Sequence, residues 1–356
     1  MSTCISIIMP VYNCGPYLES ALRSVLSQSV SDLEIIAVDD CSTDSSREIL
    51  LRVAEEDPRL RIFQNPQNMG VAAVRNLALA EAKGEFVAFC DADDTVPEGA
   101  YEALLESIGD SDVAIGGFED VVLVDETEKE RTARPVGDGC RASAFLSLFS
   151  VPCLWTKLFR TSFLRSNDLR FDEDMTIGED VVFLARVATL SPRYAVTDAT
   201  VYHHFLRRSG KYRSLTHSYG LASFQKHVEC RKRLLEICKD EPRCADFVYR
   251  QFAWDLNAYL CQIADLDERE EAFSLYQAFL CAYPYGERAS ALFLAKTGVS
   301  FEAFCNMSAN EYFECRNAVL PRDIVANEFL AGTIGFRWIW IYLKGWLQYK
   351  LSRRNP

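Results

Sequence analysis

Short apolar runs alternate with segments of helical periodicity over the N-terminal part of the chain. The apolar runs cover residues 4–10, 33–40, 59–65 and 85–94, and the helical patterns cover residues 16–28, 44–56 and 70–84. Strands that alternate with helices at this spacing build βαβ units and a mostly parallel sheet. The runs are almost continuously apolar, which is typical of strands that helices cover on both faces. We therefore expect an α/β fold with a sheet flanked by helices.

The later part of the chain changes from mixed to helical patterning. Further strands are expected at residues 112–118 and 195–205, helices at 142–149 and 179–190, and a polar loop at 125–140. Beyond these segments the pattern favours helices. The predicted organisation is an α/β domain over residues 1–215, an α-helical domain over 216–328 and a basic amphipathic helix over 329–356.

Carboxylates stand at the ends of two of the apolar runs. Asp39 and Asp40 close the second run, and Asp91, Asp93 and Asp94 close the fourth. Ligands of open α/β sheets bind at the carboxyl ends of the strands, so this edge is the candidate site. Side chains alternate along a strand, which predicts that Asp91 and Asp93 point the same way. Crowded carboxylates favour Mg²⁺ or Mn²⁺, which bind one or two carboxylates with substrate phosphates; a solvated acidic turn is the alternative.

Six short blocks occur in order along the chain. They are PVYN (10–13), VDDCSTDSS (38–46), NMGVAAVRN (68–76), DADD (91–94), LWTKLFR (154–160) and GED (178–180). Together they resemble the family 2 inverting glycosyltransferases, which have the GT-A fold. The last two blocks are most similar to bacterial members that build capsule, exopolysaccharide or O-antigen chains. The resemblance implies transfer of a sugar from a nucleotide-sugar, above all a UDP-sugar, to a glycan or lipid-linked acceptor.

The resemblance also implies a donor site at the strand ends. Pro10 and Tyr12 would line the base and the ribose, and Asp39 would accept a base N–H, which suits uracil or thymine. Asn68 and Arg75 fall in the block that lies close to the nucleotide-sugar.

Further positions extend this donor site. Asp91 would bind the ribose or the sugar, and Trp155 and Lys157 match the block that shapes the sugar and acceptor pocket. Arg207 opens a basic stretch that would contact the diphosphate when a loop closes, although a solvated basic loop is the alternative.

For the reaction itself, the resemblance assigns Asp180 as the catalytic base, with Glu179 beside it, and Asp93 as the main ligand of Mn²⁺ or Mg²⁺. His204 is a candidate third metal ligand, and a half-buried strand histidine is the alternative. Without the resemblance, Glu179 and Asp180 would be interpreted as charges that stabilise a helix N-terminus. A metal neutralises the leaving diphosphate, while one carboxylate base deprotonates the attacking hydroxyl, which suffices for inversion.

Cysteine raises two questions in this sequence. Cys41 stands where the family usually has glycine, and a cysteine is costly there if the backbone requires a positive φ. The chain has thirteen scattered cysteines, from which we expect reduced, mostly buried thiols.

Charge separates the tail from the rest of the chain. The net charge of −13 disfavours a nucleic-acid partner, because the phosphate backbone requires basic residues. Residues 329–356, however, hold five basic residues, three of the five tryptophans and no acidic residue. This pattern predicts a helix on an anionic membrane surface; docking on the protein or on a second subunit is the alternative, which leaves a homodimer open. With neither a signal peptide nor a spanning segment in the sequence, we expect a cytoplasmic protein at the inner face of the membrane.

Two other classes of protein compete with a glycosyltransferase. A nucleotidyltransferase would need a Gly-rich, basic phosphate loop after the first strand, and the PVYN segment lacks one. A non-catalytic, membrane-bound scaffold with a degenerate transferase fold would not be expected to keep Asp39, Asp91, Asp93 and Asp180 together.

Overall fold

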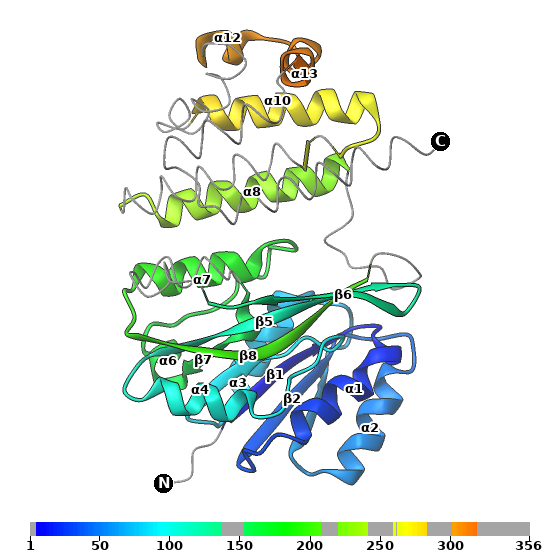
Figure 1. Ribbon diagram of the computed structural model, residues 1–356, viewed down its shortest axis with the longest axis vertical. Coiled ribbons are helices and arrows are strands. Elements are labelled where there is room, and N and C mark those ends of the chain that lie inside the picture. Colours follow the sequence, from blue (N-terminus) through cyan, green and yellow to red (C-terminus); the bar gives the residue numbers. More distant parts are fainter. Residues whose placement is uncertain are drawn as a thin grey trace. The chain divides into compact units, whose positions relative to one another are not determined.

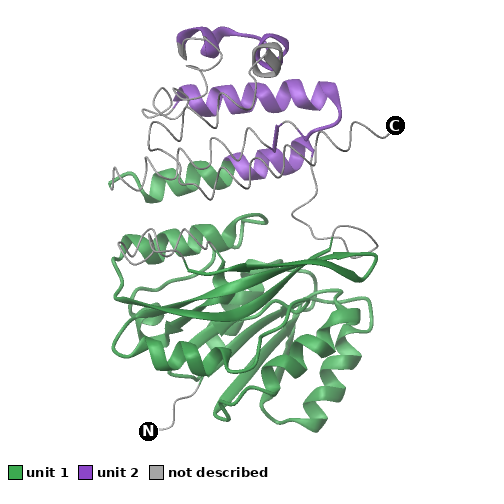
Figure 2. Cartoon of the chain, in the orientation of Figure 1, with its two compact units in different colours: residues 1–218, 229–245 green, residues 219–228, 246–356 purple. Residues whose placement is uncertain are grey.

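The computed structural model describes residues 5–136, 153–207, 220–240, 259–260, 262–282 and 301–318 (Figure 1). Two compact units divide the chain (Figure 2): the first holds residues 1–218 and 229–245, and the second holds residues 219–228 and 246–356. The predicted domain limits stay predictions. The helices predicted at residues 142–149 and 329–356 lie outside the described residues.

The first unit is built on one eight-stranded sheet with the order β3-β2-β1-β4-β7-β5-β6, in which β8 also pairs with β5. The strands are β1 (Ile5–Val11), β2 (Leu33–Asp39), β3 (Leu60–Gln64), β4 (Phe86–Phe89), β5 (Val113–Val124), β6 (Thr127–Arg134), β7 (Lys157–Arg160) and β8 (Tyr194–Arg207). Strands β1 to β4 run parallel, and β8 is parallel to β5. Strand β7 lies antiparallel between β4 and β5, and β6 is antiparallel to β5. The α/β prediction is confirmed, with a parallel N-terminal half and a mixed C-terminal half.

Helices cover both faces of this sheet (Figure 1). They are α1 (Gly15–Leu26), α2 (Ser46–Glu56), α3 (Val71–Glu81), α4 (Ala100–Ile108), α6 (Thr161–Ser166) and α7 (Glu179–Thr189), and a 3₁₀ turn η2 (Leu154–Thr156) precedes β7. Ile5, Ile7 and Met9 of β1 join a buried cluster with residues of α1, α2 and α4. On the other face, Phe89 of β4 packs against Phe183 of α7, with 6.4 Å between ring centroids. Burial on both faces explains why the strands are continuously apolar.

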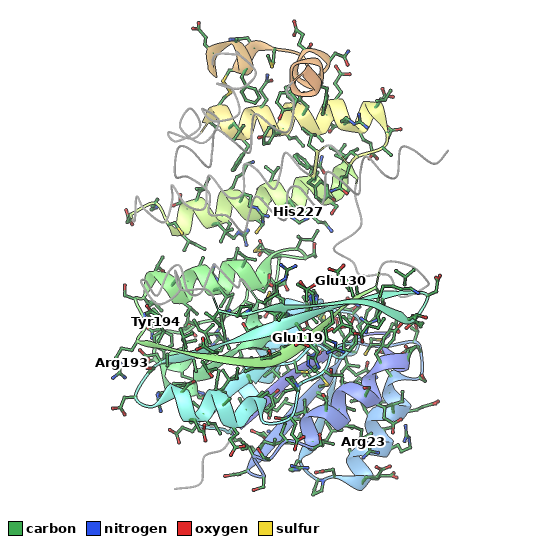
Figure 3. All side chains as sticks on the ribbon, viewed as in Figure 1. Arg23, Glu119, Glu130, Arg193, Tyr194 and His227 are labelled. Carbon is green, nitrogen blue, oxygen red and sulfur yellow. A yellow bond between two sulfur atoms is a disulfide. The ribbon has the colours of Figure 1, made fainter. Side chains whose placement is uncertain are left out.

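The structure differs from the sequence prediction at β6, where a loop was expected. Strand β5 continues to Val124, and Asp125 and Glu126 form a turn with φ of 50° and 57°. The returning strand is largely exposed, and its Arg131 pairs at 3.0 Å with Glu119 of β5, which Figure 3 labels. Because β6 is an edge strand that buries neither face, its apolar and polar residues do not alternate. The sequence pattern that predicts a strand is therefore absent there.

The second unit is helical where it is described. It contains α10 (Leu266–Ala282), α12 (Phe301–Asn306), α13 (Ala309–Ala318) and the first part of α8 (Leu221–Ile237), whose second part belongs to the first unit. Phe273, Tyr276, Phe304 and Tyr312 form its aromatic core. Within the described ranges, the helices are too short or too polar to cross a membrane.

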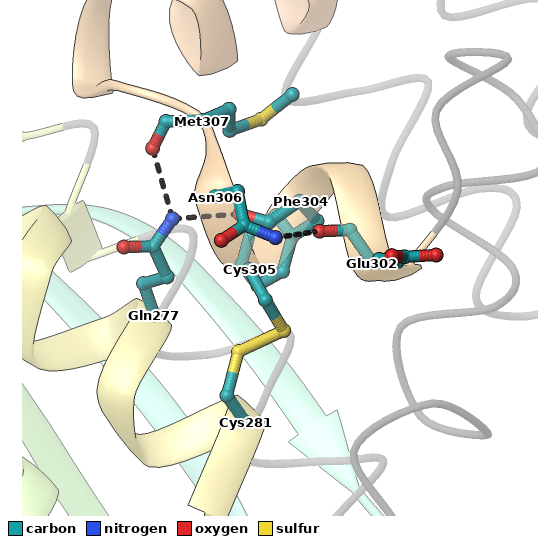
Figure 4. The surroundings of a disulfide bond; sticks show 7 residues. All are labelled: Gln277, Cys281, Glu302, Phe304, Cys305, Asn306 and Met307. Carbon is teal, nitrogen blue, oxygen red and sulfur yellow. Dashed lines mark hydrogen bonds between the residues drawn. A yellow bond between two sulfur atoms is a disulfide. The ribbon is translucent and has the colours of Figure 1, made fainter.

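Cys281 of α10 and Cys305 of α12 form a disulfide (Figure 4). Beside it, the Gln277 side chain donates hydrogen bonds to the carbonyl oxygens of Phe304 at 2.6 Å and Met307 at 2.9 Å. The expectation of reduced thiols is therefore wrong for this pair, because helix packing joins sulfurs that are 24 residues apart in sequence. Cys14, Cys41, Cys90, Cys153 and Cys230 are free cysteines.

Candidate active site

The carboxyl ends of β1, β2 and β4 lie side by side, because these strands are parallel neighbours. Val11, the last residue of β1, is paired with Asp39, the last residue of β2. Asp39 is fully buried, and its Oδ1 accepts a hydrogen bond from the Ser42 backbone N–H at 3.0 Å. Pro10 is half-buried, and Tyr12, just beyond β1, is 50% exposed. This edge therefore combines a buried carboxylate with an accessible aromatic ring.

Asp40, which follows Asp39, fixes the loop before α3. Its Oδ1 accepts hydrogen bonds from the Asn65 side chain at 2.7 Å and from the Met69 backbone N–H at 2.8 Å. Its Oδ2 accepts another from the Gly70 backbone N–H at 2.8 Å. The predicted donor residue Asn68 lies exposed in this loop. Sequence reasoning gave Asp40 no role of its own, although a second carboxylate at the strand end was the available signal.

The DADD block forms a turn beyond β4, which ends at Phe89. The backbone N–H of Asp94 donates to the carbonyl oxygen of Asp91 at 3.2 Å. The argument from alternation along a strand, which placed Asp91 and Asp93 on one face, is therefore wrong. The Oδ1 of Asp94 accepts a hydrogen bond from the Phe205 backbone N–H at 2.8 Å, and burial raises the pKa of Asp94. This contact ties the turn to β8.

Arg75 of α3 connects the DADD turn to α7. Its buried guanidinium places Nη1 2.6 Å from Glu179 Oε1 and Nη2 3.3 Å from Asp91 Oδ1. The same guanidinium lies over the Phe171 ring, 5.5 Å from its centroid. Its Nε is buried and has no hydrogen-bond partner among the described residues. Arg75 thus brings together residues from three of the six sequence blocks.

Asp180 lies in the first turn of α7, directly after Gly178 (φ 76°) and Glu179. Its Oδ1 accepts a hydrogen bond from the Val181 backbone N–H at 2.8 Å. Burial raises the pKa of Asp180 to about 7, with Glu179 raising it further and Arg75 lowering it. A carboxylate whose pKa lies near neutrality is suited to accept a proton at physiological pH. Of the two adjacent carboxylates, Glu179 forms the ion pair with Arg75, and Asp180 has a pKa of about 7.

Asp93 faces Arg207, the last residue of β8. Arg207 Nη1 lies 2.7 Å from Asp93 Oδ2, and the side chain of Arg207 is 3% exposed while that of Asp93 is 47% exposed. Desolvation by the surrounding protein raises the pKa of Asp93 despite this exposure, and Arg207 lowers it. The Arg207 guanidinium lies 3.8 Å from the centroid of the Tyr17 ring in α1. The predicted metal carboxylate and the predicted diphosphate-binding arginine are therefore direct partners.

His204, the candidate third ligand, is held by Asp120 of β5, whose Oδ1 lies 3.0 Å from His204 Nδ1. Burial lowers the pKa of His204, but the bond to Asp120 and nearby carboxylates outweigh it and raise the pKa. Trp155 stacks on Tyr202 and on His204, with 4.3 Å and 5.3 Å between ring centroids. The Tyr202 hydroxyl accepts a hydrogen bond from the Asp91 backbone N–H at 3.0 Å. Sequence reasoning missed Asp120 and Tyr202, for which no motif gave a signal.

Lys157 is fully buried. Its Nζ donates to the Cys153 carbonyl oxygen at 2.6 Å and to Thr156 Oγ1 at 3.2 Å. The neighbouring Trp155 is only partly buried. Of the two residues predicted to shape the pocket, the tryptophan is thus accessible, while the lysine supports the backbone from inside.

In the described part of the chain, no three His, Cys, Asp or Glu side chains are grouped so as to hold a metal ion. The donors still fit Mg²⁺ or Mn²⁺, which bind one or two carboxylates and complete their coordination with phosphate oxygens and water. Asp91 and the half-exposed Asp93 supply such oxygens from one turn. His204 already uses Nδ1 on Asp120, which leaves Nε2 as its only nitrogen for a metal.

This mixed sheet, with carboxylates at its strand ends and an acidic pair at the start of α7, agrees with the GT-A fold that the six sequence blocks imply. Residues 6–167 match the model of the family "Glycosyl transferase family 2", and this part of the chain is a family 2 glycosyltransferase domain. Glu179 and Asp180 lie beyond the matched residues.

Relatives extend the similarity toward the C-terminus. The chain is 29% identical over 209 residues to Glycosyltransferase GlyG of Streptococcus pneumoniae, covering 54% of this chain and 69% of GlyG. It is 26% identical over 303 residues to Poly(ribitol-phosphate) beta-N-acetylglucosaminyltransferase TarS of Staphylococcus aureus, covering 82% of this chain but only about half, 51%, of TarS. The crystal structure of S. aureus TarS 1-349 in complex with UDP-GlcNAc is similar with a TM-score of 0.63 and 25% identity, covering 85% of this chain and 88% of that one.

Proposed function

We propose that the chain is an inverting, metal-dependent hexosyltransferase that moves a sugar from a UDP-sugar to a hydroxyl group of a surface glycan or lipid-linked acceptor. One observation carries this proposal: Asp180, whose pKa is about 7, is joined through Glu179 and Arg75 to Asp91 at the strand ends. A base is needed at this position, beside the donor sugar. The UDP-GlcNAc bound by TarS supports UDP as the nucleotide.

The donor would lie along the strand ends. Tyr12 and Pro10 would pack on the uracil, and Asp39 would accept its N–H through Oδ2, where Gln64 Nε2 lies 3.5 Å away. The Ser42 backbone N–H holds the other Asp39 oxygen and so orients the carboxylate. Gln64 and Arg47, whose Nη1 lies 4.0 Å away, are the neighbours of Oδ2 that a base N–H would join or displace. Stacking with one oriented acceptor favours a pyrimidine that carries a ring N–H.

The sugar and diphosphate would follow over the DADD turn. Asn68 and Arg75 would contact the sugar, and Arg207 would contact the diphosphate from beside Asp93. Asp93 and Asp91 would hold Mn²⁺ or Mg²⁺, which when bound neutralises charge on the leaving diphosphate. Trp155 would form a wall of the acceptor pocket, with Lys157 supporting it from inside.

In the reaction, Asp180 would take the proton of the acceptor hydroxyl group. At the same time, the hydroxyl oxygen of the acceptor would form a bond to the anomeric carbon of the donor sugar. The bond from that carbon to the diphosphate oxygen breaks, and UDP leaves with the electron pair. Attack from the face opposite the diphosphate inverts the anomeric centre and requires no nucleophilic carboxylate. Glu179 would act by keeping Arg75 in place rather than by taking the proton.

A thermal-shift screen of nucleotide-sugars with Mn²⁺, followed by transfer assays on Asp180→Asn, tests the proposal. We expect a UDP-sugar to raise the melting temperature, because ligand binding stabilises the folded state. Asp180→Asn should keep this shift and lose transfer by more than about tenfold. Transfer that survives the substitution contradicts the assignment of the base, and pyrophosphate release from a nucleoside triphosphate would favour a nucleotidyltransferase.

Residues 329–356 are proposed to hold the protein on an anionic membrane at the cytoplasmic face, where lipid-linked acceptors are available. Their five basic residues, without an acidic one, support this location. Removal of the tail should release the protein from liposomes that contain anionic lipid and leave UDP release from the donor intact. Continued sedimentation contradicts the proposal, and a change from dimer to monomer on removal would favour a subunit contact instead.

A further inference from the structure

The segment that leads into α7 is held at its start by α3 and α7. The Asn76 side chain of α3 accepts from the Phe171 backbone N–H and donates to the Phe171 carbonyl oxygen, both at 2.9 Å. Asp172 accepts two hydrogen bonds from Arg186 of α7, at 2.6 Å and 2.8 Å. The Phe171 ring stacks on Phe183 of α7, with 4.3 Å between centroids. The start of this segment, residues 171–178, is therefore joined to the helix that carries Asp180.

Arg233, in the part of α8 that belongs to the first unit, is a third anchor of the same segment. Its Nη1 lies 2.9 Å from both Asp172 Oδ2 and Asp174 Oδ1, and its Nη2 lies 2.9 Å from Asp174 Oδ2. The Arg233 side chain is 26% exposed and that of Asp172 is 17% exposed. Charge-assisted bonds that use both arms of a guanidinium fix direction as well as distance, which a lysine cannot reproduce.

One turn earlier on α8, Cys230 packs against Gly178, the residue directly before α7. Its Sγ lies 3.7 Å from the Gly178 carbonyl oxygen, and a Cβ added to Gly178 would lie only 2.5 Å from that sulfur. Gly178 has φ of 76°, which glycine adopts without strain. The same face of α8 thus contacts both the middle of residues 171–178 and their last residue, Gly178. Gly178 lies two residues before Asp180 in the sequence.

We propose that Arg233 is a positioning residue for Asp180. It acts through Asp172 and Asp174, which set the direction in which the chain enters α7 and therefore where the Asp180 carboxylate lies. This inference rests on the proposed function and extends the machinery beyond residue 167, where the family match ends. A displacement of about 1 Å in a reacting group can reduce a rate by about 100-fold, so a partial loss of anchoring has a kinetic effect without any lost substrate contact.

The test compares Arg233→Met and Arg233→Lys with a matched control, Lys232→Met, in the full chain. Lys232 is the adjacent α8 residue, 49% exposed, and its Nζ lies 4.0 Å from Glu229. UDP release from UDP-GlcNAc without acceptor gives kcat and KM, and calorimetry gives the Kd of UDP. We expect Arg233→Met to lower kcat about tenfold with KM and the UDP Kd within about twofold of wild type, Arg233→Lys to lose about threefold, and Lys232→Met to match wild type.

A second measurement does not depend on the donor. Hydrogen–deuterium exchange of peptides that cover residues 171–184 should be faster in Arg233→Met than in Lys232→Met, and unchanged in peptides of β1 and β2. If Arg233→Met does not fold, Asp174→Asn removes a partner whose side chain is 70% exposed and weakens two of the three contacts. It should lower kcat about threefold.

Equal kcat in Arg233→Met and Lys232→Met, equal exchange of the two variants, or a KM that rises in parallel with the loss of kcat would each overturn the positioning role. The variant Asp180→Asn distinguishes a failure of the positioning role of Arg233 from a failure of the proposed function. If Asp180→Asn still releases UDP, the proposed base is wrong. If it does not, while Arg233→Met remains fully active, only the role of Arg233 is wrong.

Discussion

Replacing Asp180 by asparagine should stabilise the folded protein at neutral pH while it abolishes transfer. Burial raises the pKa of Asp180 from 3.8 to about 7, so the folded protein binds this proton more tightly than the unfolded chain. For a carboxyl group shifted in this direction, the free energy of unfolding falls as the pH rises from the unfolded to the folded pKa. The amide of asparagine has a similar shape and remains neutral, so it avoids this loss.

The size of the effect follows from the shift in pKa. One unit corresponds to about 1.4 kcal/mol of difference between the two protonation states. Between pH 5 and pH 8, about two pKa units of the shift affect the free energy of unfolding. This is because the folded protein keeps the Asp180 proton at pH 5 and has lost most of it at pH 8. Asp180→Asn should therefore gain about 2 to 3 kcal/mol over wild type across this interval. The two proteins should converge in more acidic solution, where Asp180 is protonated in both states.

Urea unfolding in metal-free buffer at several pH values, followed by tryptophan fluorescence, measures this difference. Asp168→Asn is the matched control, because the Asp168 side chain is 82% exposed and asparagine also tolerates its φ of 44°. The control should follow the wild-type curve at every pH. Parallel curves for wild type and Asp180→Asn would show that Asp180 has an ordinary pKa, which would refute the argument that burial prepares it as a base.

Three further predictions concern other parts of the site. The kcat/KM for UDP release should rise with pH through about 7, and Glu179→Gln should move this rise to lower pH, because the Glu179 charge raises the pKa of Asp180. Cys41→Gly should raise the melting temperature by a few degrees and Cys41→Ala should not, since Cys41 has φ of 63° and only glycine relieves about 1 kcal/mol of strain. Calorimetry should find UDP binding weakened severalfold by Tyr17→Leu but not by Tyr17→Phe, because the ring beneath Arg207 contributes about 0.5 to 2 kcal/mol. A pH profile that does not move, equal melting temperatures, or equal affinities of the two Tyr17 variants would contradict these expectations in turn.

The clearest apolar runs in the sequence are β1, β2 and β4, which are almost wholly buried. Ile5, Ile7 and Met9 are fully buried, so their run is apolar and readable as a strand. The exposed edge strand β6 has no such signal, and the four-residue β7 was not predicted because it is short and includes the buried Lys157. Where tertiary contacts decide burial, the local pattern does not contain the answer.

The candidate site divides in a similar way. Asp91, Arg75 and Glu179 come from separate sequence blocks, and the structure brings them into contact. The bonds of Asp120 to His204 and of Tyr202 to Asp91 join residues 84 and 111 positions apart, and they depend on the packing of β8 beside β5 and against the DADD turn. No periodicity predicts such pairings, because each requires the register of two distant segments.

Cys41 has a φ of 63°, the left-handed conformation that glycine adopts more readily than cysteine, so the backbone is strained at this position. Cys41 follows Asp39, which accepts a hydrogen bond from the Ser42 backbone N–H, and Asp40, which fixes the loop before α3. A turn that must orient both carboxylates leaves little freedom to relax around a Cβ atom. The strain at Cys41 is thus a consequence of the site beside it.

The adjacent carboxylates Glu179 and Asp180 show how one arginine separates two roles. Arg75 lies 2.6 Å from Glu179, which therefore stays paired, and Asp180 is left with burial that is only partly compensated. Had Arg75 paired directly with Asp180, the pKa of that carboxylate would be low and it would be a weak base. The other arm of Arg75 lies 3.3 Å from Asp91. A ligand that binds Asp91 would therefore also act on the cation that lowers the pKa of Asp180. The proposed function therefore predicts that donor binding and proton acceptance are coupled through this buried guanidinium.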